Sequence, residues 1–173
     1  MAWRARFAER RTWRNDRGSQ LVEFALVLPI LCLLLVGAWD FGSAFAMKQK
    51  LTNAAREGGR IVVSNTTLPT TSCAPGTNPP CSISAAATAV GQYLNNAGLS
   101  GSCLSSANAT GSFPVWTWSC SSITLSINRG VNAGVDTTVT LTYPVTWSLR
   151  NFFGVTVIPN QITTHVTMQN LTL

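Results

Sequence analysis

The longest apolar stretch of the chain lies near its N-terminus. From Leu21 to Trp39, 19 residues contain one charged side chain, that of Glu23. At 1.5 Å per residue this stretch corresponds to about 28 Å of α-helix, close to the hydrocarbon thickness of a bilayer. The pattern therefore predicts a membrane-spanning helix. Pro29 lies inside it and removes one backbone hydrogen bond, which membrane helices tolerate.

The helix is predicted to continue past the apolar stretch. Between Met47 and Val63, apolar or small residues recur at three- and four-residue spacing, which is typical of an amphipathic helix. The residues on that face are Met47, Leu51, Ala54, Ala55, Gly58, Ile61 and Val62. We expect one helix from about residue 20 to 63, with its first half in lipid and its second half carrying a folded domain.

A loop and a second helix are predicted next. Residues 64–82 contain four prolines, one of them in the pair Pro75-Gly76, and these break any helix. Residues 83–97 carry apolar side chains at helical spacing, and Gly98 follows as a plausible C-terminal stop. Residues 99–121 are expected to be irregular apart from a strand at Val115–Trp118.

From residue 122 the apolar period changes to two, which indicates strands. Strands are expected near 123–127, 135–143 and 162–168, with a turn at 129–134 and an end or bend at Pro144. Three or four antiparallel strands packed on a long helix make an α+β fold. The stretch 147–159 is apolar for a loop and would be core, a membrane contact or a partner contact; we favour core.

These elements divide the chain into three parts. Residues 1–18 form a basic leader, residues 19–63 the long helix, and residues 64–173 a folded α+β domain. The leader holds six arginines, whereas residues 61–173 hold only three charged side chains: Arg129, Asp136 and Arg150. The net charge of +6 is therefore an orientation signal and an attraction to anionic lipid rather than a nucleic-acid interface.

Cysteines support the same orientation. Cys73, Cys81, Cys103 and Cys120 follow the span, and disulfides persist in oxidising compartments. We expect the N-terminus in the cytoplasm, one pass through the cytoplasmic membrane and the C-terminal domain outside. Four cysteines allow three connectivities; Cys103 with Cys120 is the first choice, and a Cys73–Cys81 bridge would close the loop. Cys32 lies inside the span as inert filler.

The sequence shows no arrangement typical of an enzyme. His165 is the single histidine, and Asp136 is the only acid beyond the long helix, so no carboxylate pair is available for acid–base chemistry. Neither a phosphate loop nor a nucleophile elbow is present. We predict a non-enzymatic protein that needs no cofactor and no metal ion.

The junction between the leader and the span resembles the processing signal of type IV pilin-like proteins. A basic leader ends in Gly18, Ser19 follows, and Glu23 is the fifth residue after the glycine. The resemblance implies that a prepilin-type peptidase cuts after Gly18 and leaves Ser19 as the new N-terminus. Because an unpaired acid in lipid is costly, Glu23 is the expected intramembrane assembly residue.

A longer match looks like the N-terminal segment of TadE-like proteins of the tight-adherence pilus system. It covers residues 18–63, with Asp40 where the family more often has Glu and Gly59 where Ala is usual. The positions that carry it are Gly18, Val22-Glu23-Phe24-Ala25, Pro29, Gly37, Asp40, Gly42 and Leu51-Thr52-Asn53-Ala54-Ala55-Arg56-Glu57-Gly58-Gly59-Arg60.

The resemblance implies a minor pilin or pseudopilin in a cell-adhesion or secretion system. Its partners would be TadE- or TadG-type proteins, pilin subunits and the inner-membrane assembly platform, with no nucleic acid. Small residues such as Gly37 and Gly42 would let another helix approach. Arg56, Glu57 and Arg60 would form ion pairs between helices or with the domain.

Three other readings stay open. Ala44-Phe45-Ala46 matches a signal-peptide cleavage site, which would release a soluble secreted domain. An uncleaved bitopic envelope protein would display a small extracytoplasmic binding module. An enzyme of the cell envelope is the third possibility.

Overall fold

The computed structural model describes residues 16–64, 78–129, 136–148, 150, 154 and 159–169. Contacts divide the chain into two compact units, residues 1–38 and residues 39–173. The long helix α1, Asp16–Ser64, contributes to both units. Its bounds agree closely with the expected helix from about 20 to 63.

The described part of the first unit is helical. From Gly18 to Ala38 every residue is exposed except the half-buried Gly37, and Pro29 lies within the helix. Gly18–Ser64 is long and apolar enough, by length and composition, to cross a membrane once. Large apolar side chains on the surface of a helix are the composition that a bilayer requires.

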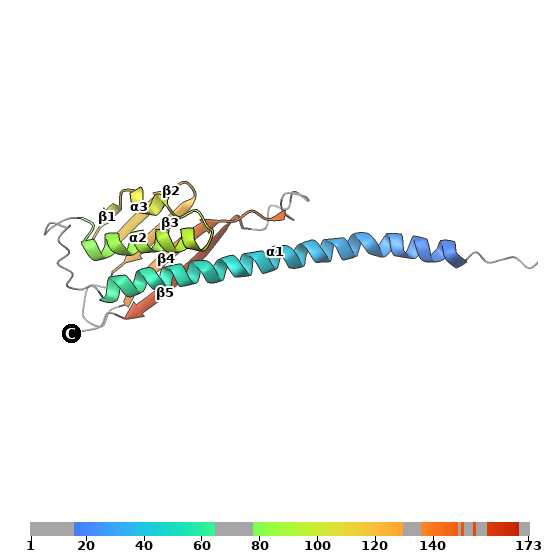
Figure 1. Cartoon of the computed structure of the whole chain (residues 1–173), viewed down its shortest axis with the longest axis horizontal. Coiled ribbons are helices and arrows are strands. Elements are labelled where there is room, and N and C mark those ends of the chain that lie inside the picture. The colour runs from blue at the N-terminus through green and yellow to red at the C-terminus, as the bar shows by residue number, and fades with distance from the viewer. Residues whose placement is uncertain are drawn as a thin grey trace, which may run out of the picture. The chain divides into compact units, whose positions relative to one another are not determined.

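The second unit is an α+β domain, as the sequence predicts (Figure 1). The described residues of this unit form residues 39–64 of α1, the shorter helices α2 and α3, and one antiparallel sheet in the order β1-β2-β3-β4-β5. The elements are α2 (Cys81–Asn96), α3 (Cys103–Ser106), β1 (Thr110–Ser112), β2 (Val115–Cys120), β3 (Ile123–Asn128), β4 (Asp136–Pro144) and β5 (Gln161–Gln169).

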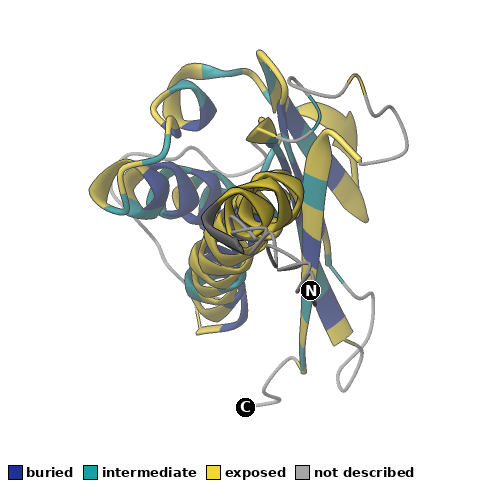
Figure 2. Cartoon of the chain, turned by 90° about the vertical axis from the view of Figure 1, so that its right-hand side faces the viewer, coloured by how far each residue is buried: buried dark blue, intermediate teal, exposed yellow. Residues whose placement is uncertain are grey.

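The core lies between one face of the sheet and the helices α1 and α2 (Figure 2). Alternate residues of β3 and β4 point into it, so the apolar period of two is confirmed in both strands. The helices contribute the side chains of Leu51, Val62, Ile83, Val90 and Leu94, and the strands those of Trp116, Trp118, Leu125, Ile127, Val139 and Leu141.

Close contacts hold α1 against its neighbours in this unit. Gly58 packs on α2, where an added Cβ would lie 2.6 Å from Val90 Cγ2. The hydroxyls of Thr52 and Thr164 are 3.0 Å apart and link α1 to β5. The Lys50 ammonium donates to the carbonyl of Ala97 at 2.8 Å, just beyond the C-terminal end of α2. α1 is therefore a core helix of the domain as well as the predicted anchor.

Residues 99–121 are more ordered than expected. They contain α3 and the edge strand β1, and the sheet has five strands where three or four were expected. β1 reads Thr-Gly-Ser and is exposed throughout, so it carries no apolar pattern. Its pairing with β2 defines it: Thr110 lies opposite Thr117, and its hydroxyl donates to the Thr117 carbonyl at 3.1 Å.

Several expected turns can be compared with the structure. α2 ends at Asn96, and Gly98 has φ +78°, which agrees with its predicted role as a stop. β4 ends at Pro144, as expected. Most of the predicted loop at 64–82 and of the predicted turn at 129–134 lies outside the described residues, and α2 begins at Cys81, two residues before the expected start at 83. Most of 147–159, where the Trp147 indole donates to the Pro159 carbonyl at 2.6 Å, also lies outside the described residues.

Candidate assembly site on the long helix

The predicted processing site lies at the start of α1. Gly18 and Ser19 are both exposed, and an added Cβ at Gly18 would meet nothing within 4 Å. Glu23 is exposed and lies four residues after Ser19, which places both on one face of the helix. Glu23 is the only charged residue between residues 18 and 39, so it is the one charged position of the predicted span.

Asp40 marks the point where α1 enters the core of the second unit. Only 4% of Asp40 is exposed, and Ala44 one turn later is also buried. The Ser43 hydroxyl donates to the Asp40 backbone carbonyl at 2.8 Å. Among the described residues, no buried side-chain nitrogen or oxygen lacks a hydrogen-bond partner. Asp40 is thus a buried polar residue at the base of the domain.

The two small positions of the helix differ in their surroundings. Gly37 is half-buried, whereas Gly42 is exposed with nothing within 4 Å of an added Cβ. Gly42 therefore leaves an open position on the surface of α1. Their predicted role in helix packing, together with that of Pro29 and Asp40, stays a prediction.

The basic and acidic residues near the end of α1 form one ion pair within the helix. Arg60 Nη2 lies 2.8 Å from Glu57 Oε1, and Arg60 Nε donates to Glu57 Oε2 at 3.2 Å. Glu57 raises the pKa of the Arg60 guanidinium through the hydrogen bond first and its charge second. Arg56 is exposed. Such a surface pair contributes little stability, so the interhelical ion pairs remain a prediction.

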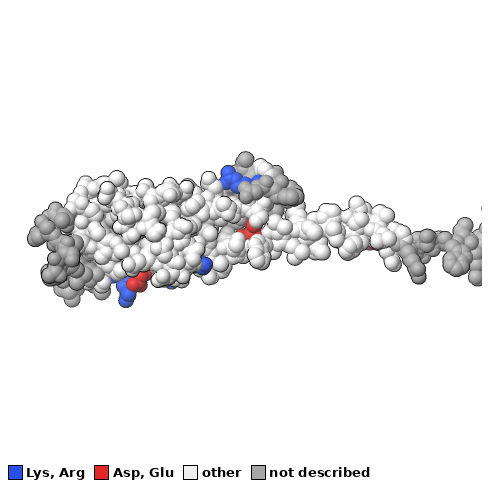
Figure 3. All heavy atoms as spheres, turned by 45° about the horizontal axis from the view of Figure 1, so that its top comes forward, with Lys and Arg blue, Asp and Glu red and all other residues white. Residues whose placement is uncertain are grey.

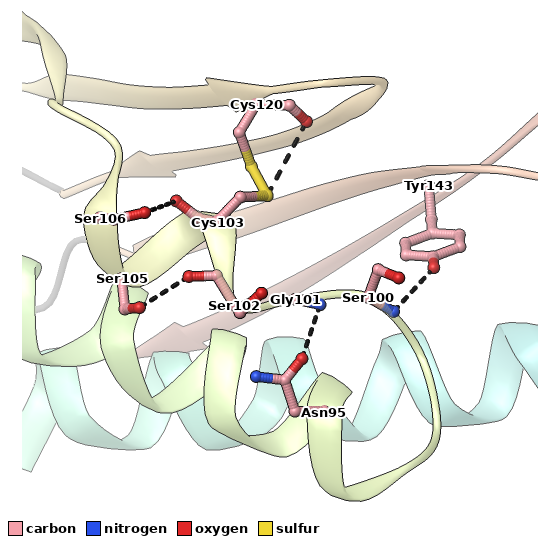
Figure 4. The surroundings of a disulfide bond; sticks show 9 residues. All are labelled: Asn95, Ser100, Gly101, Ser102, Cys103, Ser105, Ser106, Cys120 and Tyr143. Atoms are coloured by element: carbon pink, nitrogen blue, oxygen red, sulfur yellow. Dashed lines mark hydrogen bonds between the residues drawn. A yellow bond between two sulfur atoms is a disulfide. The ribbon is translucent and has the colours of Figure 1, made fainter.

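The predicted bridge between Cys103 and Cys120 is present (Figure 4). It ties α3 to the end of β2. Two hydrogen bonds fix the segment before it: the Gly101 amide donates to Asn95 Oδ1 at 2.9 Å, and the Ser100 amide to the Tyr143 hydroxyl at 3.1 Å.

The other cysteines are placed only in part. Cys81 is disulfide-bonded, while Cys73, its expected partner, lies outside the described residues. Cys32 is a free, exposed cysteine of α1. In the described ranges no group of three or more His, Cys, Asp or Glu side chains is placed to hold a metal ion.

The structure also shows an exposed aromatic cluster that sequence reasoning did not single out. Trp39, Phe41 and Phe45 are 77%, 74% and 58% exposed, although they lie beside the buried residues 40 and 44. One feature of the sequence indicates this exposure. When the helical period of the second half of the helix is extended back to these residues, the three aromatic side chains fall outside its apolar face.

A comparison with known protein families gives a match that lies within α1. Residues 18–60 match the family model described as TadE-like protein. This segment is TadE-like. It begins at the predicted processing glycine and ends at Arg60, inside α1. A TadE-like segment implies a part in tight-adherence pilus assembly at a membrane. No curated protein and no solved structure matches the chain.

Proposed function

We propose that this chain is a minor pilin or pseudopilin of a tight-adherence pilus or secretion system. The TadE-like segment carries the proposal, because it coincides with a helix that is exposed and apolar in its first half and core-forming in its second. A helix of this kind anchors a subunit in the membrane and presents a folded domain beyond it. The role is structural rather than catalytic.

In this proposal a prepilin-type peptidase removes residues 1–18 on the cytoplasmic side, and the domain lies outside. Cutting after Gly18 leaves an ammonium group on Ser19. In an assembled filament the Glu23 carboxylate of one subunit would pair with the Ser19 ammonium of its neighbour, which removes the cost of two isolated charges in lipid. Related TadE- or TadG-type subunits, the major pilin and the inner-membrane platform are the proposed partners.

The mature N-terminus tests this proposal. Intact mass and N-terminal sequencing of protein from native membranes should give a start at Ser19, and deletion of the prepilin-type peptidase should abolish that start. A start at Met47 would make the chain a soluble secreted domain. An intact leader would leave an uncleaved bitopic envelope protein with a binding module outside.

Two matched glycine variants show whether the cut is specific. Neither Gly18 nor Gly42 has an atom within 4 Å of an added Cβ, so Gly18→Val and Gly42→Val introduce similar crowding. We expect Gly18→Val to retain the leader and Gly42→Val to be processed normally. Equal processing of the two variants would count against a cut after Gly18.

Assembly is tested separately at Glu23. Glu23→Gln keeps the size of the side chain and removes its charge, so the protein should still be cut and inserted but be lost from the sheared filament fraction. Asp136→Asn is the control, because Asp136 is an exposed acid of β4, away from the long helix. If Glu23→Gln enters filaments as well as Asp136→Asn does, the assembly role of Glu23 is wrong.

A further inference from the structure

Three aromatic residues of α1, where the second unit begins, are defined here as the aromatic collar: Trp39, Phe41 and Phe45. All three are mainly exposed, while Asp40 and Ala44 between them are buried. Three large exposed aromatic side chains within seven residues are unusual on a protein surface that faces water. The collar therefore needs an apolar environment that the described part of the chain does not supply.

The collar lies on both flanks of the core-facing stripe of α1. Trp39 is eleven residues before Lys50, so it shares the flank on which Lys50 bonds to Ala97 after α2. Phe45 is seven residues before Thr52, so it shares the opposite flank, on which Thr52 contacts Thr164 of β5. A partner protein would cover one side of the helix. A lipid surface, in contrast, would contact every side of the helix that the domain does not cover.

We propose that the aromatic collar seats the domain directly on the phospholipid surface of the membrane that the span enters. Trp39 to Phe45 covers about 9 Å along the helix, which is close to the depth of one interfacial layer. Aromatic residues are enriched at that depth. The inference rests on the proposed insertion of the span. It adds the level at which the collar lies in the bilayer and a direct contact between the domain and the lipid surface.

The residues beyond the collar fit the headgroup layer. Lys48 is exposed and lies one turn after Phe45, and the two line the same surface hollow of α1. Its ammonium would reach the level of the lipid phosphates. The exposed residues of the helix that follow it, up to Arg56, are all polar or charged (Gln49, Lys50, Asn53 and Arg56), so Phe45 is the last large exposed apolar side chain of α1.

Charge alone would not hold the domain at the membrane surface. In the view of Figure 3 the second unit shows few charged side chains, and residues 61–173 contain only three. Four basic residues lie between 39 and 60, but Arg60 is paired with Glu57 and Lys50 donates to the Ala97 carbonyl. Electrostatic attraction of a domain to anionic lipid requires a cluster of basic residues. Contact with the membrane surface would therefore depend on the aromatic collar together with Lys48.

The test is site-directed spin labelling of the full chain in phosphatidylethanolamine–phosphatidylglycerol vesicles. Single cysteines replace Phe41, Phe45 or Asn53 in a Cys32→Ser background, and collisions with oxygen and with a water-soluble nickel chelate are compared. Labels at 41 and 45 should favour oxygen, and the label at 53 should favour nickel. Intact mass verifies that the Cys103–Cys120 bridge has formed in each variant.

Each other outcome overturns the inference in a different way. Nickel access at 41 and 45 would place the collar in water, above the membrane. Protection of these two labels from both reagents would indicate a protein partner instead. An Ile30→Cys label reports on the span itself: nickel access there would overturn both the insertion and the collar, whereas oxygen access there with nickel access at 41 would overturn the collar alone.

Discussion

At the scale of single residues, two neighbouring glycines of α1 differ in what surrounds them. An added Cβ at Gly58 would lie 2.6 Å from Val90 Cγ2, a branched side chain held in the core. At Gly59 it would lie 3.0 Å from the sulfur of Met168. A thioether side chain is flexible and adapts to its neighbours, whereas a β-branched side chain is stiff at χ1.

Gly58→Ala should therefore destabilise the protein, and Gly59→Ala should not. Alanine gains about 1 kcal/mol of helix propensity at either site. At Gly58 overpacking against Val90 should outweigh that gain, for a net loss of about 1–2 kcal/mol. Urea unfolding of the full chain in detergent micelles, followed by near-ultraviolet circular dichroism, measures both.

A second variant separates overpacking from other causes. Val90→Ala removes the methyl groups that the new Cβ would meet, so the Gly58→Ala and Val90→Ala changes should be less costly together than the sum of the two alone. Additive effects would show that the contact with Val90 is not what makes position 58 restrictive.

A hydrogen bond between the buried Trp116 and the exposed Asn78 gives the second residue-scale prediction. The indole of Trp116, which is almost fully buried, donates to Asn78 Oδ1 at 2.6 Å, and Asn78 Nδ2 donates to the Gly111 carbonyl at 3.3 Å. Asn78→Ala should cost about 1–3 kcal/mol of unfolding free energy, because it leaves a buried indole donor unpaired. Asn108→Ala, at an exposed position, is the control and should change stability little.

At the scale of elements, the Cys103–Cys120 bridge joins α3, a helix of only four residues, to the sheet. The two cysteines are 17 residues apart. In the chain-entropy model, closing a loop of this size restricts the unfolded chain and raises its free energy by about 3 kcal/mol. Replacing both cysteines with serine should lower the free energy of unfolding by about that amount.

Cys32→Ser is the matched control, since Cys32 is free and exposed on α1. Denaturant unfolding of both variants under oxidising conditions makes the comparison. If the double variant is as stable as Cys32→Ser, the bridge does not stabilise the fold, and the contacts around Gly101 and Tyr143 would be sufficient to hold the segment.

The elements that the sequence predicts well are those with a strong apolar period. The length of the apolar run predicts the first half of α1. The period of 3.6 residues predicts its second half and α2, and the period of two predicts β3, β4 and β5, because in each of these one face packs on the core. β1 and α3 carry no such period, and they depend on pairing with β2 and on the disulfide, which are contacts distant in sequence. Glu23 and Gly18 were found through a resemblance, whereas the exposure of Phe41 and Phe45 required the packing of the domain.

At the scale of the whole chain, α1 belongs to both compact units. Its second half supplies Leu51, Ala54, Ala55 and Val62, none of which has exposed surface. A boundary at 63/64 therefore separates the sheet from part of its own core. The second half of α1 therefore cannot shift along α2 and β5 without disrupting this packing.

Two fragments test this dependence on α1. A fragment from Met47 to Leu173 keeps the core residues of the helix and lacks the span and the collar, so it should be soluble and unfold cooperatively. A fragment from Ser64 to Leu173 loses six buried apolar residues of α1, among them Leu51, Val62 and Val63. Losses of about 2–5 kcal/mol for each large core side chain approach the whole stability of a small domain, so this fragment should show no cooperative transition.

Thermal unfolding followed by near-ultraviolet circular dichroism compares the two fragments. Cooperative unfolding of the shorter fragment would show that α2 and the sheet fold without α1, and that the long helix serves the chain only as an anchor.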